Sequence, residues 1–145
     1  MSADLVWQII KANNSFLVKR AGVEFSSEPG NLKNLNSYKY SGLANEKVVS
    51  IEANASGKGA VLSTKKKGKA NHPSKGIQKA PLTKGIRRSA LSVTNVVARS
   101  GYRPDLHKAA LARVSAIYAS QKPKKTLPAK KVRGARAAAA ATKQE

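Results

Sequence analysis

The chain has 145 residues, of which 28 are Lys or Arg and 7 are Asp or Glu, so its formal net charge is +21. A body with this charge repels itself and requires a polyanion, for which nucleic acid and anionic membrane are the common candidates. Residues 1–64 hold 7 basic and 5 acidic residues, whereas residues 65–145 hold 21 and 2. The anion must therefore lie against the second half. Because cysteine is absent, a disulfide framework and a thiolate metal site are both excluded.

The N-terminus has the signature of a short helix. Ser2 is placed to cap a helix that begins at Ala3, and an apolar stripe recurs at helical spacing at Leu5, Val6, Ile9 and Ile10. A strand is the competing interpretation, because Val and Ile favour strands. The stretch is too short and too polar to indicate a signal peptide or a membrane span.

Two β-hairpins are predicted next. Residues 15–20 and 23–27 flank Ala21-Gly22, and a tight turn there would place Phe16, Val18, Val23 and Phe25 on one face. Residues 47–53 and 59–65 alternate in polarity around a turn at residues 54–58. Together they predict a small antiparallel sheet. Between them, residues 28–43 are rich in Asn, Ser, Gly and Pro and are expected to form an ordered loop.

Residues 65–81 carry six lysines among Gly, Ser, Asn and Pro, and we expect them to be disordered unless RNA orders them. After Thr83, a plausible helix cap, apolar residues repeat at helical spacing until Gly101. Pro104 then suits a first helical turn, and a second apolar face runs until Lys122-Pro123. This pattern predicts a helical hairpin with basic outer faces, followed by a mobile Lys/Ala/Pro-rich tail.

Phosphate binding is the strongest functional signal. Lysine and arginine side chains neutralise phosphates and release condensed counterions, so affinity should fall steeply with salt. Two tyrosines beside a lysine can either stack on unpaired bases or pack on the sheet, and packing is the favoured reading. Trp7 is also assigned to packing. The candidate RNA-binding residues are Lys19, Arg20, Tyr38, Lys39, Tyr40, Lys65, Lys66, Lys67, Lys69, Arg87, Arg88, Arg99, Arg103, Lys108 and Arg113.

The sequence offers few candidate catalytic residues. His72 lies in the lysine-rich segment, and the side chains of Asp105 and His107 diverge on a helix. Asp105 is better explained as a complement to the helix dipole. No group of His, Asp or Glu has metal-ligand spacing, so we expect no catalytic residue, metal, cofactor or small-molecule substrate. The apolar face of residues 104–121 is mostly alanine, which argues against a membrane partner.

Several segments in one order resemble the eukaryote-specific large ribosomal subunit protein twenty-eight family across about residues 2–123. They include the opening SADLVW, SFLVKR at residues 15–20, NSYKYSGL at residues 36–43, YRPDL at residues 102–106 and SQKP at residues 120–123. The resemblance implies an α+β protein of the large subunit that contacts ribosomal RNA and neighbouring ribosomal proteins. It also implies assembly in the nucleolus and a working place on cytoplasmic ribosomes.

Composition and resemblance together predict a non-catalytic, structural RNA-binding protein of the α+β class. Residues 1–64 form its globular part, 65–82 a basic flexible segment, 83–122 a basic helical hairpin and 123–145 a tail. The rivals are a chromatin-compacting protein, suggested by the Lys/Ala/Pro mixture of the tail, and an RNA-modifying enzyme, which lacks acid, base and metal groups. A chromatin protein would carry a winged-helix body instead of sheet hairpins.

Overall fold

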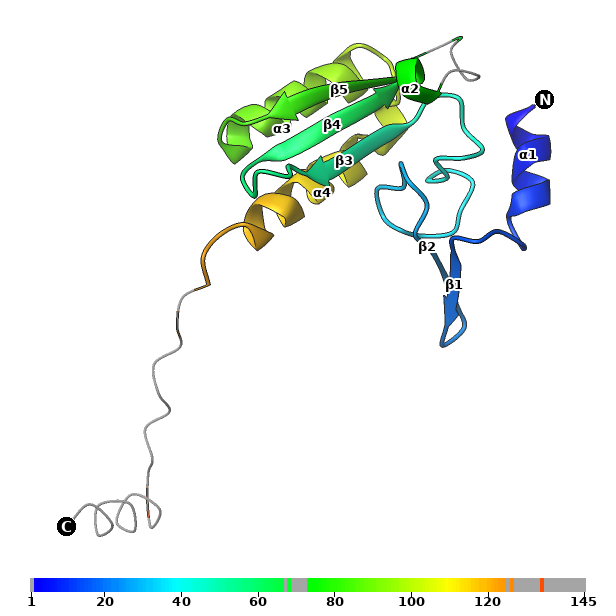
Figure 1. Cartoon of the computed structure of the whole chain (residues 1–145), viewed down its shortest axis with the longest axis horizontal. Coiled ribbons are helices and arrows are strands. Elements are labelled where there is room, and N and C mark those ends of the chain that lie inside the picture. Colours follow the sequence, from blue (N-terminus) through cyan, green and yellow to red (C-terminus); the bar gives the residue numbers. More distant parts are fainter. Residues whose placement is uncertain (1, 67, 69–72, 125, 127–133, 135–145) are drawn as a thin grey trace.

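The computed structural model describes residues 2–66, 68, 73–124, 126 and 134. The fold is of the α+β class, as predicted, with a short N-terminal helix, then the strands, then the C-terminal helices (Figure 1). In chain order the elements are α1 (Ala3–Ile10), β1 (Leu17–Arg20), β2 (Val23–Ser26), β3 (Val49–Ala53), β4 (Ala60–Lys65), α2 (Pro73–Gly76), β5 (Ile77–Leu82), α3 (Ile86–Thr94), the π-helix η1 (Asn95–Arg99), the 3-10 helix η2 (Pro104–Leu106) and α4 (His107–Ser120).

The core lies between a three-stranded antiparallel sheet, in the order β3-β4-β5, and the helices α3 and α4 (Figure 1). Every second residue of the sheet points toward the helices, among them Val49, Ile51 and Leu62, which are all at most 2% exposed. The helices contribute Val93 and Val114, which are fully buried. Burying each such side chain stabilises the fold by roughly 1.5–3 kcal/mol. This two-layer body is what fixes the orientation of the basic helices.

Strand β5 corrects the expectation that residues 65–81 lack regular structure. Residues 77–82 pair antiparallel with β4, from Ile77 opposite Lys65 to Leu82 opposite Ala60. Pro81 is tolerated because β5 is an edge strand, where half of the backbone N–H groups point away from the sheet. Residues 67 and 69–72 of the same segment lie outside the described part of the chain.

The N-terminal elements form as predicted but bury little. Ser2 caps α1 by accepting a hydrogen bond from the Leu5 N–H at 3.3 Å. The β1–β2 hairpin turns at Ala21-Gly22, both at positive φ, and forms a two-stranded sheet of its own. Its predicted apolar face is present, because Val18 pairs with Phe25, yet each of these side chains remains 42% exposed.

The loop between the two sheets is ordered by a buried carboxylate. The Glu28 carboxylate accepts hydrogen bonds from the Asn31 amide at 3.0 Å and the Ser41 hydroxyl at 3.2 Å. The Ser26 hydroxyl accepts the Glu28 backbone N–H at 3.3 Å. These side chains are at most 6% exposed, so each buried polar group requires its partner. The expectation of an ordered loop over residues 28–43 is confirmed.

The helical hairpin is also confirmed. Ala110, Val114 and Ile117 face the core, as their spacing predicts. Gly85, rather than Thr83, is the residue that precedes α3, and it makes no side-chain cap. Gly101, at φ +67, ends the first helical arm, and Pro104 begins the second. The predicted tail of residues 123–145 lies largely outside the described residues.

Candidate nucleic-acid interface

The outward surface of α3 and η1 carries arginines. Ser89, Val93 and Val97 point to the core, so Arg87 and Arg88 lie on the opposite side of the helix. Both side chains are exposed, as is that of Arg99. Within the described part of the chain, none of the three forms a salt bridge or donates a side-chain hydrogen bond. Their guanidinium groups are therefore free to meet an external anion.

The π-helical turn η1 sets the position of Arg99. The Ser100 N–H donates to the Asn95 carbonyl at 3.0 Å, a bond that spans five residues instead of four. This wider turn keeps Val97 buried while the chain approaches its reversal at Gly101. π-turns inside helices recur at functional sites. Arg99 consequently lies at the end of the same exposed helical surface on which Arg87 and Arg88 lie.

Other predicted contacts lie in α4 and at the end of β4 and differ in exposure. Lys108, early in α4, is exposed, whereas Arg113 is half-buried. Lys66 is exposed just after β4, and its backbone N–H donates to the Gly76 carbonyl at 2.7 Å. From Thr83 to Lys122 the sequence has eight Lys or Arg residues and one acid, Asp105. Lys67 and Lys69, also predicted RNA contacts, lie outside the described residues.

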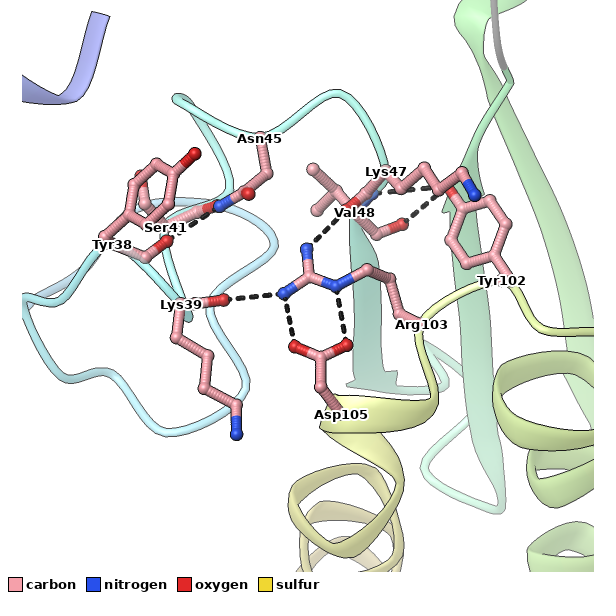
Figure 2. A network of polar contacts seen from close by, with 9 residues as sticks. All are labelled: Tyr38, Lys39, Ser41, Asn45, Lys47, Val48, Tyr102, Arg103 and Asp105. Atoms are coloured by element: carbon pink, nitrogen blue, oxygen red, sulfur yellow. Dashed lines mark hydrogen bonds and ion pairs between the residues drawn. The ribbon is translucent and has the colours of Figure 1, made fainter. Parts of the chain in front are cut away.

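Arg103 has a different environment from the one that the sequence suggested. Figure 2 shows its guanidinium enclosed by protein acceptors. Nε and Nη2 donate to the two carboxylate oxygens of Asp105 at 2.8 Å each. Nη1 donates to the Lys47 carbonyl and Nη2 to the Lys39 carbonyl, both at 2.9 Å. Four of the five N–H donors of an arginine are thus used internally.

Arg103 therefore has a structural role, because it connects the loop before β3 to the start of η2. Its side chain is 15% exposed, and its partners come from the loop before β3 and from the start of η2. The Arg103 guanidinium holds the pKa of Asp105 below its ordinary value, since it donates hydrogen bonds to the charged carboxylate. Asp105 was expected to complement a helix dipole, but its strongest contact is this ion pair.

Tyr102 supports the same junction. Its hydroxyl accepts the Val48 N–H at 3.2 Å (Figure 2) and donates to the Lys65 carbonyl at 2.6 Å. Tyr102 therefore joins the start of β3 and the end of β4 to the helical hairpin. Burial raises the pKa of the Tyr102 phenol. At the other end of the body, the Gln121 side chain both donates to and accepts from the backbone of Gly59, at 2.7 and 2.8 Å. No pattern in the sequence predicts these long-range bonds.

In the Tyr38-Lys39-Tyr40 segment, the two tyrosine rings mainly pack against other side chains. The Tyr38 ring lies 6.0 Å from the Trp7 ring, centroid to centroid, and a hydrogen bond to Asp4 raises its pKa. Tyr40 packs against the core, with the Lys33 ammonium 5.3 Å from its ring. Residues 38–40 form a turn rather than an extended stretch, so the two tyrosines have separate neighbours. Packing was the favoured reading for both tyrosines and for Trp7, and these contacts agree with it.

Lys19 and Arg20 lie at the tip of the β1–β2 hairpin. Lys19 forms a 3.0 Å ion pair with Glu24, directly across the hairpin, and this contact lowers the pKa of Glu24. The pair is exposed to solvent and so contributes little to stability. Arg20 is exposed and forms no ion pair with another described residue.

Metal and membrane sites gain no support from the described residues. Over residues 2–66 and 73–124, no three His, Asp or Glu side chains gather into a possible metal site. His107 lies 3.1 Å from the Thr94 hydroxyl, a contact between helices, and His72 is outside the described residues. None of the described helices has the length and apolar character that crossing a membrane requires.

Comparison with known proteins identifies the family of this chain. Residues 5–120 match the model of the ribosomal L28e protein family. The large ribosomal subunit protein eL28 of Schizosaccharomyces pombe is 44% identical over 132 residues, covering 88% of this chain and 98% of that protein. The eL28 proteins of Dictyostelium discoideum and Caenorhabditis elegans are 39% and 40% identical, over 92% and 83% of this chain and 98% and 91% of their own lengths. The chain belongs to the ribosomal L28e family, whose members are large-subunit ribosomal proteins and not enzymes.

Proposed function

We propose that this chain is a structural component of the large subunit of the eukaryotic cytoplasmic ribosome, where it binds ribosomal RNA by neutralising phosphates. The observation that carries the proposal is the exposed basic surface of the helical hairpin. Arg87, Arg88 and Arg99 project from the exposed side of helices that the buried residues Val93 and Val97 hold against the core. The named relatives are large ribosomal subunit proteins, which supports ribosomal RNA as the polyanion.

The mode of binding follows from the chemistry of these side chains. Guanidinium groups form forked, charge-assisted hydrogen bonds to phosphate oxygens. Contacts of this kind fix position and orientation but do not read bases. Specificity for one RNA location then comes from matching a rigid arrangement of charges to the shape of folded RNA. Lys65, Lys66, Lys108 and Arg113 would extend the contact, as would Lys67 and Lys69.

Arg103 plays a supporting part in this proposal. Its internal hydrogen bonds leave one N–H donor for RNA, so we assign it to holding the loop of residues 39–47 against the body. Tyr38 and Tyr40 are assigned to packing, because Tyr38 lies against Trp7 and Tyr40 packs on the core. Lys19, Lys39 and Arg20 remain peripheral phosphate contacts, because each has an exposed side chain and lies outside α3 and α4.

A second partner is suggested by α1. Its apolar residues Leu5 and Ile9 are 51% and 63% exposed, and none of its eight residues is buried. The one charged residue of α1 is Asp4, which repels phosphate. An exposed apolar surface without positive charge suits a neighbouring ribosomal protein with an apolar face, rather than RNA.

Fractionation of a eukaryotic cell lysate tests the proposal. The tagged chain should sediment with large ribosomal subunits on a sucrose gradient and be released by ribonuclease or by high salt. Imaging should also find it in the nucleolus, where we propose that it joins the assembling subunit. Sedimentation with chromatin, and release by deoxyribonuclease instead, would contradict the ribosomal assignment and favour the chromatin rival.

A further inference from the structure

The three-stranded sheet has a second face that the helices leave open. Register places the outward side chains of β3, β4 and β5 in rows across this face. Ser50, Ser63 and Lys79 form one row. In the next row Lys65 pairs with Ile77, and the Lys65 N–H donates to the Val48 carbonyl at 3.2 Å. Alternation in strands makes these side chains neighbours on one surface.

A loop from the N-terminal part turns this open face into a cleft. Pro29, Gly30 and Gly42 line its wall, and the sheet rows form its floor. The wall is fixed closely against the sheet, because a Cβ atom on Gly30 would approach the Val48 side chain to 2.4 Å. The volume of the cleft is about 360 Å³. This is near the lower end of the roughly 300–1,000 Å³ of small-molecule sites, which suits one nucleotide better than a helix.

The lining has the chemistry of a nucleotide site. Lys65 and Lys79 supply positive charge, and Val48 and Ile77 supply an apolar surface on which a base can lie. Ile77 is 48% exposed although it lies in a strand, so this surface is uncovered. The Ser63 hydroxyl is available as a donor or acceptor. Glu52, which accepts a hydrogen bond from Ser50 at 3.0 Å, adds an acceptor for a base amino group.

We propose that this cleft binds one unpaired nucleotide of RNA, with its base against Ile77 and Val48 and its phosphate at Lys79 and Lys65. The inference rests on the proposed RNA-binding function and adds a second kind of contact to it. The helical surface holds phosphates of folded RNA, whereas the cleft takes a nucleotide that has left its stack. Sequence-dependent RNA recognition commonly uses such splayed nucleotides.

The test uses the full-length protein and two RNA probes, a single-stranded tetranucleotide series and a 20-base-pair duplex. The backbone amides of Gly30, Ser63 and Ile77 should shift in NMR spectra with the tetranucleotides, while the duplex should shift those of Arg87 and Arg88. Lys79→Gln should weaken tetranucleotide binding about fivefold at 0.1 M salt, the effect of losing one phosphate contact on a single strand. Ile77→Ser should also weaken it, without changing the salt slope.

Lys58→Gln is the matched control, since Lys58 is an exposed lysine in the β3–β4 turn and its loss lowers the net charge equally. It should leave tetranucleotide affinity within about twofold, as expected of a lysine that meets no phosphate. If the cleft amides do not move while the helical amides respond, the nucleotide site is contradicted and the proposed function stands. If neither set responds to any RNA, the proposed function fails as well. Crosslinks from the cleft to a protein in assembled subunits would also overturn the nucleotide assignment.

Discussion

The N-terminal part, residues 2–46, and the body, residues 47–122, are stabilised in different ways. The body buries Val49, Val93 and Val114 completely between sheet and helices. The N-terminal part buries polar groups around Glu28, while α1 and the β1–β2 hairpin leave their apolar faces exposed. The body can therefore hold charged groups in a fixed arrangement. The N-terminal part exposes apolar surface, which we propose that a neighbouring protein covers.

The two parts meet through both apolar and polar contacts. Leu32 and Tyr40 of the N-terminal part pack with the core of the body. Arg103, from the turn between the helical arms, donates to the Lys39 carbonyl across this junction and to the Lys47 carbonyl within the body (Figure 2). Because hydrogen bonds are directional, the contact between Arg103 and the Lys39 carbonyl helps to fix the relative orientation of the two parts.

Truncation of apolar side chains should reveal the largest difference in stability between the two parts. Leu62→Ala removes a side chain that is 2% exposed, and the free energy of unfolding should fall by about 2–5 kcal/mol. Leu5→Ala in α1 should change it by less than about 0.5 kcal/mol, because Leu5 is already 51% exposed. Urea denaturation followed by far-UV circular dichroism measures both. Equal losses would show that α1 packs as tightly as the body.

Breaking the junction should have the next largest effect. Arg103→Ala removes four hydrogen bonds, two of them to a carboxylate, and should cost about 2–3 kcal/mol of stability. Arg99→Ala removes an equal charge from an exposed site and should cost less than about 0.5 kcal/mol. Trp7 is the single tryptophan, so its fluorescence reports the N-terminal part. In Arg103→Ala its transition should precede that of the circular dichroism; coincident transitions would contradict a junction role.

RNA affinity should depend on the body more than on the N-terminal hairpin. Arg87→Gln combined with Arg88→Gln should lower the logarithmic salt slope of RNA binding by about 1.4–1.8, from 0.7–0.9 per phosphate. Lys19→Gln combined with Arg20→Gln should lower it by no more than about 0.9, because Lys19 is already paired with Glu24. Titrations at several salt concentrations measure both slopes. A larger change from the hairpin pair would reverse the proposed division.

Acid should weaken the junction before the core. The pKa of Asp105 is lower in the folded chain than in the unfolded one, so its stabilising contribution is complete above about pH 4. The contribution is lost as the pH falls through the lowered folded value. Asp105→Asn should be less stable at neutral pH and should lose less stability than the unmodified protein on acidification. Stability curves of equal slope below pH 4 would contradict this assignment.

The accuracy of the sequence predictions depended on whether the contacts were local. The spacing of Ala110 and Val114 predicted the buried face of α4 because helical periodicity is a local property. Strand β5 was missed because its lysines and Pro81 are typical of disorder, and the pairing with β4 that orders it is remote in sequence. Arg103 was predicted as an RNA contact because its acceptors include carbonyls of residues 39 and 47, which no side-chain pattern reveals.

The candidate site was predicted in part for the same reason. Exposed arginines on a helix, such as Arg87 and Arg88, follow from the position of the apolar stripe. Lys79 was not predicted as a contact, because β5 has little apolar alternation and only Leu82 of its six residues is buried. The cleft beside it could not be predicted, since its wall and floor come from residues far apart in the chain.

Crosslinking of RNA to protein in purified large subunits tests the central claim most directly. After ultraviolet irradiation and nuclease digestion, mass spectrometry should find nucleotides attached mainly to peptides that contain residues 84–99. Peptides from α1, residues 3–10, should crosslink to protein instead. RNA adducts concentrated on α1 and the β1–β2 hairpin, with none on α3, would contradict the account.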